Sequence, residues 1–196
     1  GQLHMRVVRS PVPFGRIGGI DAEAALGTTG VAAVWTGTNV AEIPPIDFRL
    51  SRVQGLDPYR QPILARDYVR YVGEPVAVVF AENPYLAEDA ANTVRIDVEE
   101  RRPCMVATGD IGEFAPGIDT EPAIIEKGYG DLATAFADAS HTIELELAIG
   151  RHSGVTLENR GAVAYYNDQR NRLELYGVAK VPHYNREAIA AMLGLT

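Results

Sequence analysis

The most regular hydrophobic spacing lies in one segment near the middle of the chain. Residues 75–80 form a short continuous apolar run, as expected of a strand that is covered on both faces. Asn83 and Pro84 mark a helix start, because asparagine caps a free amide and proline loses no hydrogen bond at the first helical position. Apolar residues recur at helical spacing as far as Val94, and residues 94–99 then alternate between apolar and charged. The segment therefore predicts a strand, a helix and a half-buried strand in succession.

Shorter patterns predict the elements that precede this segment. Asp21 is placed to cap a short helix over residues 22–26, and Gly27 to end it in a left-handed conformation. Residues 36–62 contain several prolines and little periodicity, which is typical of a long connection. The Gly15–Gly19 string lacks the glycine spacing of a dinucleotide-binding loop, and no long helix follows it. Short strands are predicted at residues 4–8 and 31–35.

A second set of elements is predicted towards the C-terminus. Residues 100–128 hold charged residues, prolines and glycines without a long periodic run, so they are interpreted as a linker between two units. Asp131 is placed to cap a short helix over residues 132–137. Residues 141–148 alternate between apolar and polar side chains and predict a strand.

The last predicted elements are a hairpin and a helix. The polar turn NDQRN at residues 167–171 separates apolar runs at residues 161–166 and 173–178, which is a good hairpin signal. Pro182 opens a final helix, which Gly194 is positioned to end.

Composition narrows the function classes. The chain has 196 residues, enough for one large domain or two small ones, and 46% of them are apolar, which argues against disorder. A net charge of −8 without a basic block argues against a nucleic-acid partner. The single cysteine, Cys104, excludes an internal disulfide framework and fits a cytoplasmic location. No apolar stretch approaches the ~20 residues that span a bilayer.

Four separated strings cover nearly the whole chain. They are LHMRVVRSPVPFGRIGGID with the following GVAAVWTG, then PILARDYVRYVGEPVAVVFAENPYLAEDAA, then GDLATAFADASHTIELEL, and finally GRHSGVTLENRGAVAYY. Their order and spacing resemble the large, molybdenum-cofactor-binding subunit of the xanthine dehydrogenase, aldehyde oxidase and aerobic carbon monoxide dehydrogenase family. One such string would be weak evidence, whereas four in register are strong.

This resemblance implies an α+β fold in two parts. Residues 1–104 resemble the family's α/β-hammerhead domain, residues 105–129 serve as a linker, and residues 130–196 resemble the beginning of the molybdopterin-binding domain. The chain is then an N-terminal fragment of a longer subunit. The later strands of the second domain are then missing, which leaves strand edges and apolar faces exposed. Residues 141–196 are therefore expected to dimerise or to be disordered.

Function follows from the same resemblance. Family members hydroxylate an aldehyde, a purine or another heteroaromatic carbon with water as the oxygen source, or oxidise carbon monoxide. The resemblance implies a molybdopterin-type molybdenum cofactor in the full-length protein, an iron–sulfur small subunit, an FAD medium subunit and a homodimer of the complex. The catalytic glutamate and the later cofactor-binding segments lie downstream in the family. The fragment alone is therefore expected to be inactive, with no catalytic residue and no metal site.

Lys180 is the candidate cofactor-binding residue. It stands where the family commonly has a glutamine, about 13 residues before a Leu-Gly pair that is here Leu193-Gly194. That glutamine lies beside the molybdenum centre and hydrogen-bonds an oxygen ligand. Lysine can only donate, and it carries a charge. Lys180 either keeps a donor contact to the cofactor or is an ordinary solvated residue.

Other polar residues have ordinary interpretations. Glu158 and Arg160 are read as a structural ion pair that orders a loop, with support of the cofactor channel as the alternative. The histidines, His4, His141, His152 and His183, lack the spacing of a zinc site. The acidic residues Asp110, Glu113 and Asp119 lie in the predicted linker and need no special role.

A second function class remains open from the sequence. Hammerhead-type folds also occur with biotin and lipoyl carrier domains, so the chain could be a non-catalytic partner-binding or carrier-like module. Carrier domains present their lysine at a hairpin tip, typically between methionines, whereas Lys180 sits in AKVP. A modified lysine in mass spectrometry would identify a carrier.

Overall fold

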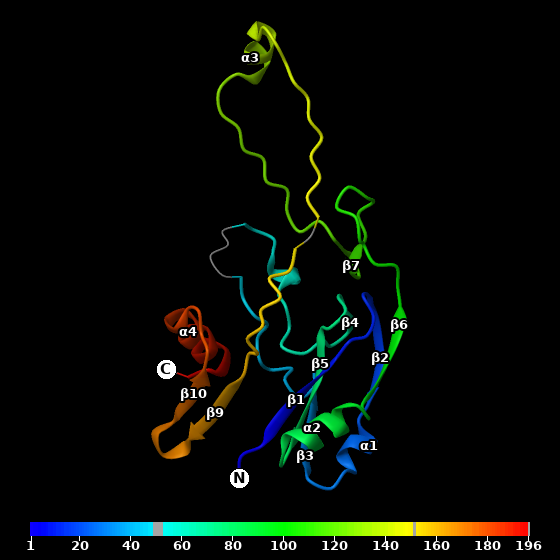
Figure 1. The fold of residues 1–196 in the computed structure, drawn as a ribbon, viewed down its shortest axis with the longest axis vertical. Coiled ribbons are helices and arrows are strands. Elements are labelled where there is room, and N and C mark those ends of the chain that lie inside the picture. The colour runs from blue at the N-terminus through cyan, green and yellow to red at the C-terminus, as the bar shows by residue number, and fades with distance from the viewer. Residues whose placement is uncertain (49–52, 151, 196) are drawn as a thin grey trace. The chain divides into compact units, whose positions relative to one another are not determined.

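The computed structural model of the chain describes residues 1–48, 53–150 and 152–195 (Figure 1). The chain divides into two compact units, residues 1–124 and residues 125–196. Both units contain helices and strands, so the predicted α+β class is confirmed. No helix in the described ranges combines the length and the apolar character needed to cross a membrane.

The first unit contains a three-stranded antiparallel sheet covered by two helices. Its strands are β1 (His4–Arg9), β5 (Pro75–Ala81) and β3 (Val31–Thr36), and its helices are α1 (Glu23–Leu26) and α2 (Pro84–Ala91). β5 is central, and β1 and β3 pair with its two edges. The small side chains of Ala25, Ala90 and Ala91 pack with Ala77 and Val79 in one buried cluster. Alanine at these positions lets the helices lie close to the sheet.

A second three-stranded sheet shares the same unit. It consists of β4 (Tyr68–Val69), β2 (Gly15–Asp21) and β6 (Arg95–Glu100), with β2 in the centre. The sequence predicted no strand over β2, since its glycines give no alternating pattern. Pairing on both edges holds this glycine-rich strand, and its register with β6 shifts between Ile17 and Gly19. Ile96 of β6 packs against the buried clusters of both sheets and so joins them.

Most local signals in the first unit are confirmed. Asn83 accepts a hydrogen bond from the backbone N–H of Leu86 at 2.9 Å, and Pro84 is the first residue of α2. Such a cap contributes about 1 kcal/mol to stability. The cap predicted at Asp21 is wrong, because Ala22 occupies the cap position of α1. Asp21 Oδ1 instead accepts from the backbone N–H of Glu23 at 3.0 Å, one position before the cap. The strands predicted at residues 4–8, 31–35, 75–80 and 94–99 are β1, β3, β5 and β6.

The left-handed stop predicted at Gly27 is wrong. Gly27 has a φ of −74°, because its N–H still bonds to the carbonyl of Glu23 and continues the helical turn. The left-handed residue is Gly30, with a φ of +91°. A Cβ there would lie 2.8 Å from Leu86 Cδ1, so glycine also allows the close approach of α2.

The segment interpreted as a linker contains a small hairpin. β7 (Glu113–Ala115) pairs antiparallel with β8 (Ile118–Asp119), and the compact first unit extends to Ile124. Residues 36–62 hold a 3-10 turn at Asp57–Tyr59 and an isolated bridge between Ile46 and Gln61 in their described part, and residues 49–52 lie outside it. The domain boundaries at residues 104 and 130 stay predictions.

The second unit has few elements and exposed apolar residues. The helices and strands of this unit are α3 (Leu132–Asp138), β9 (Ala162–Asn167), a 3-10 turn at Asp168–Arg170, β10 (Arg172–Gly177) and α4 (Pro182–Leu193). Asp131 accepts from the Thr134 N–H at 3.1 Å, the predicted hairpin is β9 and β10, and Gly194 is left-handed with a φ of +64°. These predictions are confirmed.

The strand predicted at residues 141–148 is wrong. The segment forms no strand, and among the described residues no other segment pairs with it. Its alternating apolar side chains, Ile143, Leu145 and Leu147, are 75–84% exposed. Alternation selects a strand when a neighbouring strand can accept the backbone hydrogen bonds and a core can bury one face. The expected dimerisation or disorder of residues 141–196 stays a prediction.

Candidate functional site

Lys180 lies in the connection between β10 and α4. It precedes Val181, the residue at the N-terminal cap of α4, and Pro182 occupies the first helical turn. The side chain is exposed, and within the described ranges it has no hydrogen bond or ion pair. An ammonium next to a helix N-terminus adds to the partial positive charge of the free backbone N–H groups. The junction is therefore suited to an acceptor or an anion and unsuited to a cation.

The hairpin tip before this junction is ordered by its own polar side chains. Asn167 accepts a hydrogen bond from the Arg170 N–H at 3.2 Å, and Asn171 adopts the left-handed conformation with a φ of +45°. Tyr166 donates to the side chain of Asn171. These contacts fix the turn that returns the chain through β10 towards Lys180. Lys180 does not lie at this hairpin tip, whereas a carrier domain would place its lysine there.

One face of β10 carries a polar triad. Arg172 forms an ion pair with Glu174, and the Tyr176 hydroxyl donates to Glu174 at 2.9 Å. The hydrogen bond from Arg172, with that from Tyr176, lowers the pKa of Glu174, and the same contacts raise the pKa values of Arg172 and Tyr176. Glu174 therefore stays an acceptor, because both neighbours favour its charged form.

The ion pair predicted between Glu158 and Arg160 is not formed. Both residues are exposed and lie outside helices and strands, and no contact joins their charged groups in the described part of the chain. The prediction assumed a strand, in which residues two apart point to the same face. Without that geometry, the weak attraction of exposed charges does not hold two long side chains together.

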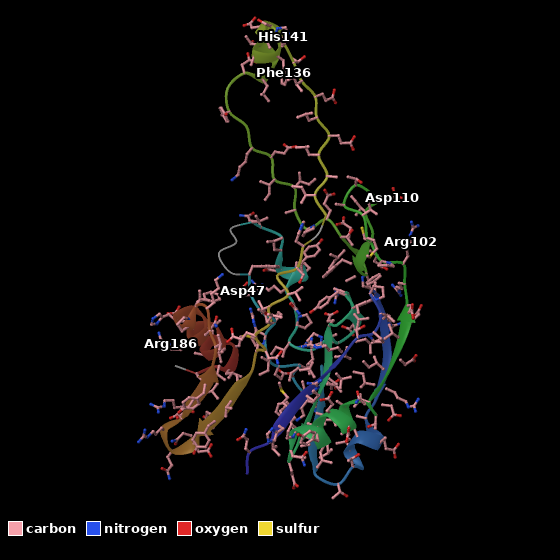
Figure 2. The ribbon with its side chains drawn as sticks, viewed as in Figure 1. Asp47, Arg102, Asp110, Phe136, His141 and Arg186 are labelled. Atoms are coloured by element: carbon pink, nitrogen blue, oxygen red, sulfur yellow. The ribbon has the colours of Figure 1, made fainter. Side chains whose placement is uncertain are left out.

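The four histidines lie on different parts of the chain, and the acidic residues of the predicted linker have partners of their own. His4 lies in β1 and His183 in the first turn of α4, whereas His141 follows α3 outside any strand (Figure 2). Glu113 is bound to Arg101 at 2.8 Å, and the Asp119 carboxylate accepts from the N–H of Glu121. Within the described ranges, no group of three or more His, Cys, Asp or Glu residues could hold a metal ion.

The first unit contains a cluster that the sequence did not predict, in which Arg70 contacts aromatic rings. We call Arg70, Tyr59, Tyr68 and Phe114 the cationic cluster. The Arg70 guanidinium lies over the Phe114 ring at 4.2 Å and over the Tyr68 ring at 5.7 Å. Tyr59 packs against Phe114 at 4.7 Å, and its hydroxyl donates to the carbonyl of Asp119 at 2.9 Å. Aromatic faces attract a guanidinium most strongly when water is excluded. The cluster therefore holds the β7–β8 hairpin against the rest of the unit.

Glu74 supports this cluster from a buried position. It is 2% exposed, and its carboxylate accepts the backbone N–H of Arg70. Burial raises the pKa of Glu74, and the Arg70 N–H and charge oppose that rise. Burial likewise lowers the pKa of Arg70, which Glu74 opposes. The turn between these residues contains Gly73, whose φ of +92° lies in the left-handed region that favours glycine.

A cavity of about 250 Å³ adjoins the cluster. Arg60, Arg66, Arg70, Asp57 and Asp67 contribute charged groups to its lining, together with Tyr68 and several prolines. Arg60 is neutralised by ion pairs to Asp47 at 3.1 Å and Asp57 at 2.9 Å, and Arg66 donates to the carbonyl of Ala41 at 2.7 Å. These contacts order the long connection after β3. The guanidinium groups of Arg60 and Arg66 are thus engaged in contacts within the chain.

The sequence contained one usable signal for this cluster. Glu74 stands directly before the buried run of β5, where a charged residue needs hydrogen-bonding partners. The contact between Arg70 and Phe114 joins residues far apart in the chain, and no local spacing predicts it.

Both units match known protein families. Residues 1–102 match the family described as "Aldehyde oxidase and xanthine dehydrogenase, a/b hammerhead domain". Residues 118–196 match the family described as "Molybdopterin cofactor-binding domain". The two matches occur in the order that the sequence predicted, and together they take in most of the chain.

Relatives are similar along the whole chain. In Paenarthrobacter nicotinovorans, subunit gamma of the 6-hydroxypseudooxynicotine dehydrogenase complex is 40% identical over 100% of this chain and 25% of its own length. Nicotine 6-hydroxylase large subunit, from the same organism, is 34% identical over 99% of this chain and 24% of its own length. The crystal structure of quinoline 2-oxidoreductase from Pseudomonas putida 86 is 29% identical with a TM-score of 0.79, over 98% of this chain and 25% of that chain. The chain thus spans about a quarter of the length of these relatives.

The buried carboxylate gives a testable pH dependence. Because the folded-state pKa of Glu74 is raised, its contribution to stability is largest below the unfolded-state pKa and is lost as pH rises through the folded-state pKa. Glu74→Gln removes this titration. The free energy of unfolding of the variant, relative to the unmodified chain, should therefore increase as the pH rises above about 4, the usual pKa of an unfolded glutamate. Urea unfolding measures this difference in the free energy of unfolding, and Glu42→Gln, at an exposed glutamate of the same unit, is the control.

An unchanged difference between the two proteins across this pH range would show that folding does not raise the pKa of Glu74. A difference that falls with rising pH would mean that the hydrogen bond and the charge of Arg70 lower the pKa of Glu74 more than burial raises it.

Proposed function

Because this chain belongs to the aldehyde oxidase and xanthine dehydrogenase family, we propose that it is part of the molybdenum-cofactor subunit of a hydroxylating oxidoreductase. The observation that carries the proposal is the succession of the two family matches along one chain. A hammerhead alone would also suit a binding module, whereas a hammerhead followed by a molybdopterin-binding domain suits an oxidoreductase. In the whole enzyme, these residues serve as scaffold, and the catalytic groups come from elsewhere in the subunit.

The proposed reaction hydroxylates a carbon of a nitrogen heteroaromatic ring with water. The names of similar proteins support this substrate class, since they act on nicotine, 6-hydroxypseudooxynicotine and quinoline. Replacing ring hydrogen by a hydroxyl group from water releases two electrons and two protons, so the enzyme needs electron acceptors. We assign that role to an iron–sulfur small subunit and an FAD medium subunit. The bound cofactor supplies the redox chemistry that no amino-acid side chain provides.

Lys180 is proposed as a hydrogen-bond donor to the cofactor. Its exposed ammonium has no partner among the described residues and lies beside the N-terminus of α4, so it can reach an acceptor without breaking a contact. A glutamine at this position would offer a neutral donor and acceptor, whereas lysine brings a positive charge that suits an anionic pterin phosphate or an anionic ligand.

Cofactor content tests the proposed function. The full-length subunit, produced together with its small and medium subunits, should contain molybdenum and pterin, measured by elemental analysis and by fluorescence of the oxidised pterin. A folded preparation free of both, from cells that load another molybdenum enzyme, would contradict the proposal.

Substitution of Lys180 tests its role separately. In the assembled enzyme, Lys180→Ala should lower cofactor content or kcat/KM on the order of 10–100-fold, as changes beside a metal centre do. Lys180→Gln should retain cofactor, because the amide still donates. Lys127→Ala, at the other lysine of the chain, is the matched control. Equal cofactor content and activity in the two alanine variants would make Lys180 an ordinary surface residue.

A further inference from the structure

A long connection runs from β3 to β4 in the first unit. We call residues 37–67 the long connection, of which 37–48 and 53–67 are described. The N–H of Ile46 donates to the carbonyl of Gln61 at 2.8 Å and ties these two described stretches together. Because this bond lies within the long connection, it does not attach the connection to either sheet.

The β7–β8 hairpin contacts the long connection at Tyr59. The ring of Tyr59 packs against Phe114 of β7 with centroids 4.7 Å apart, and its hydroxyl donates to the carbonyl of Asp119 in β8 at 2.9 Å. The guanidinium of Arg70, from the turn between β4 and β5, lies 4.2 Å from the centre of the same Phe114 ring. Phe114 therefore contacts both the long connection and the turn that enters the buried strand.

A separate contact fastens the hairpin to the second sheet. Arg101, directly after β6, forms an ion pair with Glu113 of β7 at 2.8 Å. The guanidinium of Arg101 also lies 5.4 Å from the centre of the Tyr68 ring in β4. Because these contacts do not involve the long connection, the hairpin has a fixed position to which Tyr59 can attach.

We propose that the β7–β8 hairpin is a clamp that fastens the long connection to the second sheet, so that the two segments open together. Contacts that join distant segments and depend on one another open as one cooperative unit. The hammerhead match ends at residue 102, so the clamp comes from outside it. The molybdopterin-binding match begins at residue 118, within the clamp. The clamp needs neither cofactor nor substrate and goes beyond the proposed function.

A competing anchor is present in the same unit. The side-chain amide of Gln61 donates to the hydroxyl of Tyr71 at 2.7 Å, and Tyr71 follows β4. This is a single hydrogen bond to a side chain that is 43% exposed. Exposed hydrogen bonds contribute little, whereas the clamp combines an aromatic pair, a cation–π contact and a hydrogen bond.

Hydrogen exchange of the Ile46 amide, read by mass spectrometry with electron-transfer fragmentation, tests the clamp. In the full-length subunit, Phe114→Ala should speed this exchange on the order of tenfold, because it removes the aromatic pair and the cation–π contact. The amide of Thr120, which donates to the carbonyl of Gly112 at 3.0 Å beside the hairpin, should exchange faster as well. Phe136→Ala, at an exposed phenylalanine of α3, is the matched control and should change neither amide.

Protection of the β5 amides shows whether each variant is folded. If Phe114→Ala loses that protection, Tyr59→Phe takes its place, since it removes only the hydrogen bond to Asp119. Tyr59→Phe should speed exchange at Ile46 and Thr120 severalfold.

Two results would overturn the clamp. Faster exchange at Thr120 with unchanged exchange at Ile46 would show that the hairpin does not hold the long connection. Tyr71→Phe removes only the bond from Gln61, and a larger effect of this variant than of Phe114→Ala at Ile46 would assign the anchor to the segment after β4. Neither result depends on molybdenum or pterin content, so the proposed function is tested separately.

Discussion

The first unit depends on burial of β5 between two sets of neighbours. Ala77 and Val79 belong to the core under α1 and α2, whereas Val76 belongs to a second core with Ala65 and Val69. These five side chains are at most 1% exposed, and three of them come from β5, so a single short strand contributes to both cores. Ile96 contacts both clusters and couples the second sheet to the first. A polar substitution in β5 would therefore disturb both sheets at once.

The same strand explains why the cationic cluster stays in place. Glu74 precedes β5, and its carboxylate binds the backbone of Arg70, so the turn that admits the chain to the core also positions the guanidinium. Arg70 then holds Phe114 and with it the β7–β8 hairpin. A segment that looks like a linker in the sequence is thus attached to the core through one buried carboxylate and one stacked cation. These contacts are structural, and the proposed cofactor contact, Lys180, lies in the second unit.

Signals that act within a few residues were predictable from the sequence. Asn83, Asp131 and Gly194 act through their own side chain or backbone and need no distant partner, and all three lie where the sequence placed them. Features that need a distant partner were missed: β2 is held by strands on both sides, and residues 141–148 alternate but pair with no strand among the described residues. The family and Lys180 came from resemblance alone. Local physics would have left Lys180 as one exposed lysine among other charged residues.

Native-state hydrogen exchange of the first unit tests the role of β5 most directly. If β5 joins the two cores, the amides of β5 and of the strands that pair with it, β1 and β3, should exchange through the same opening as those between β2 and β6. They should share one free energy and one denaturant dependence. Exchange of the β2–β6 amides through a separate opening of lower energy, with β5 still protected, would show two independent cores and contradict the account.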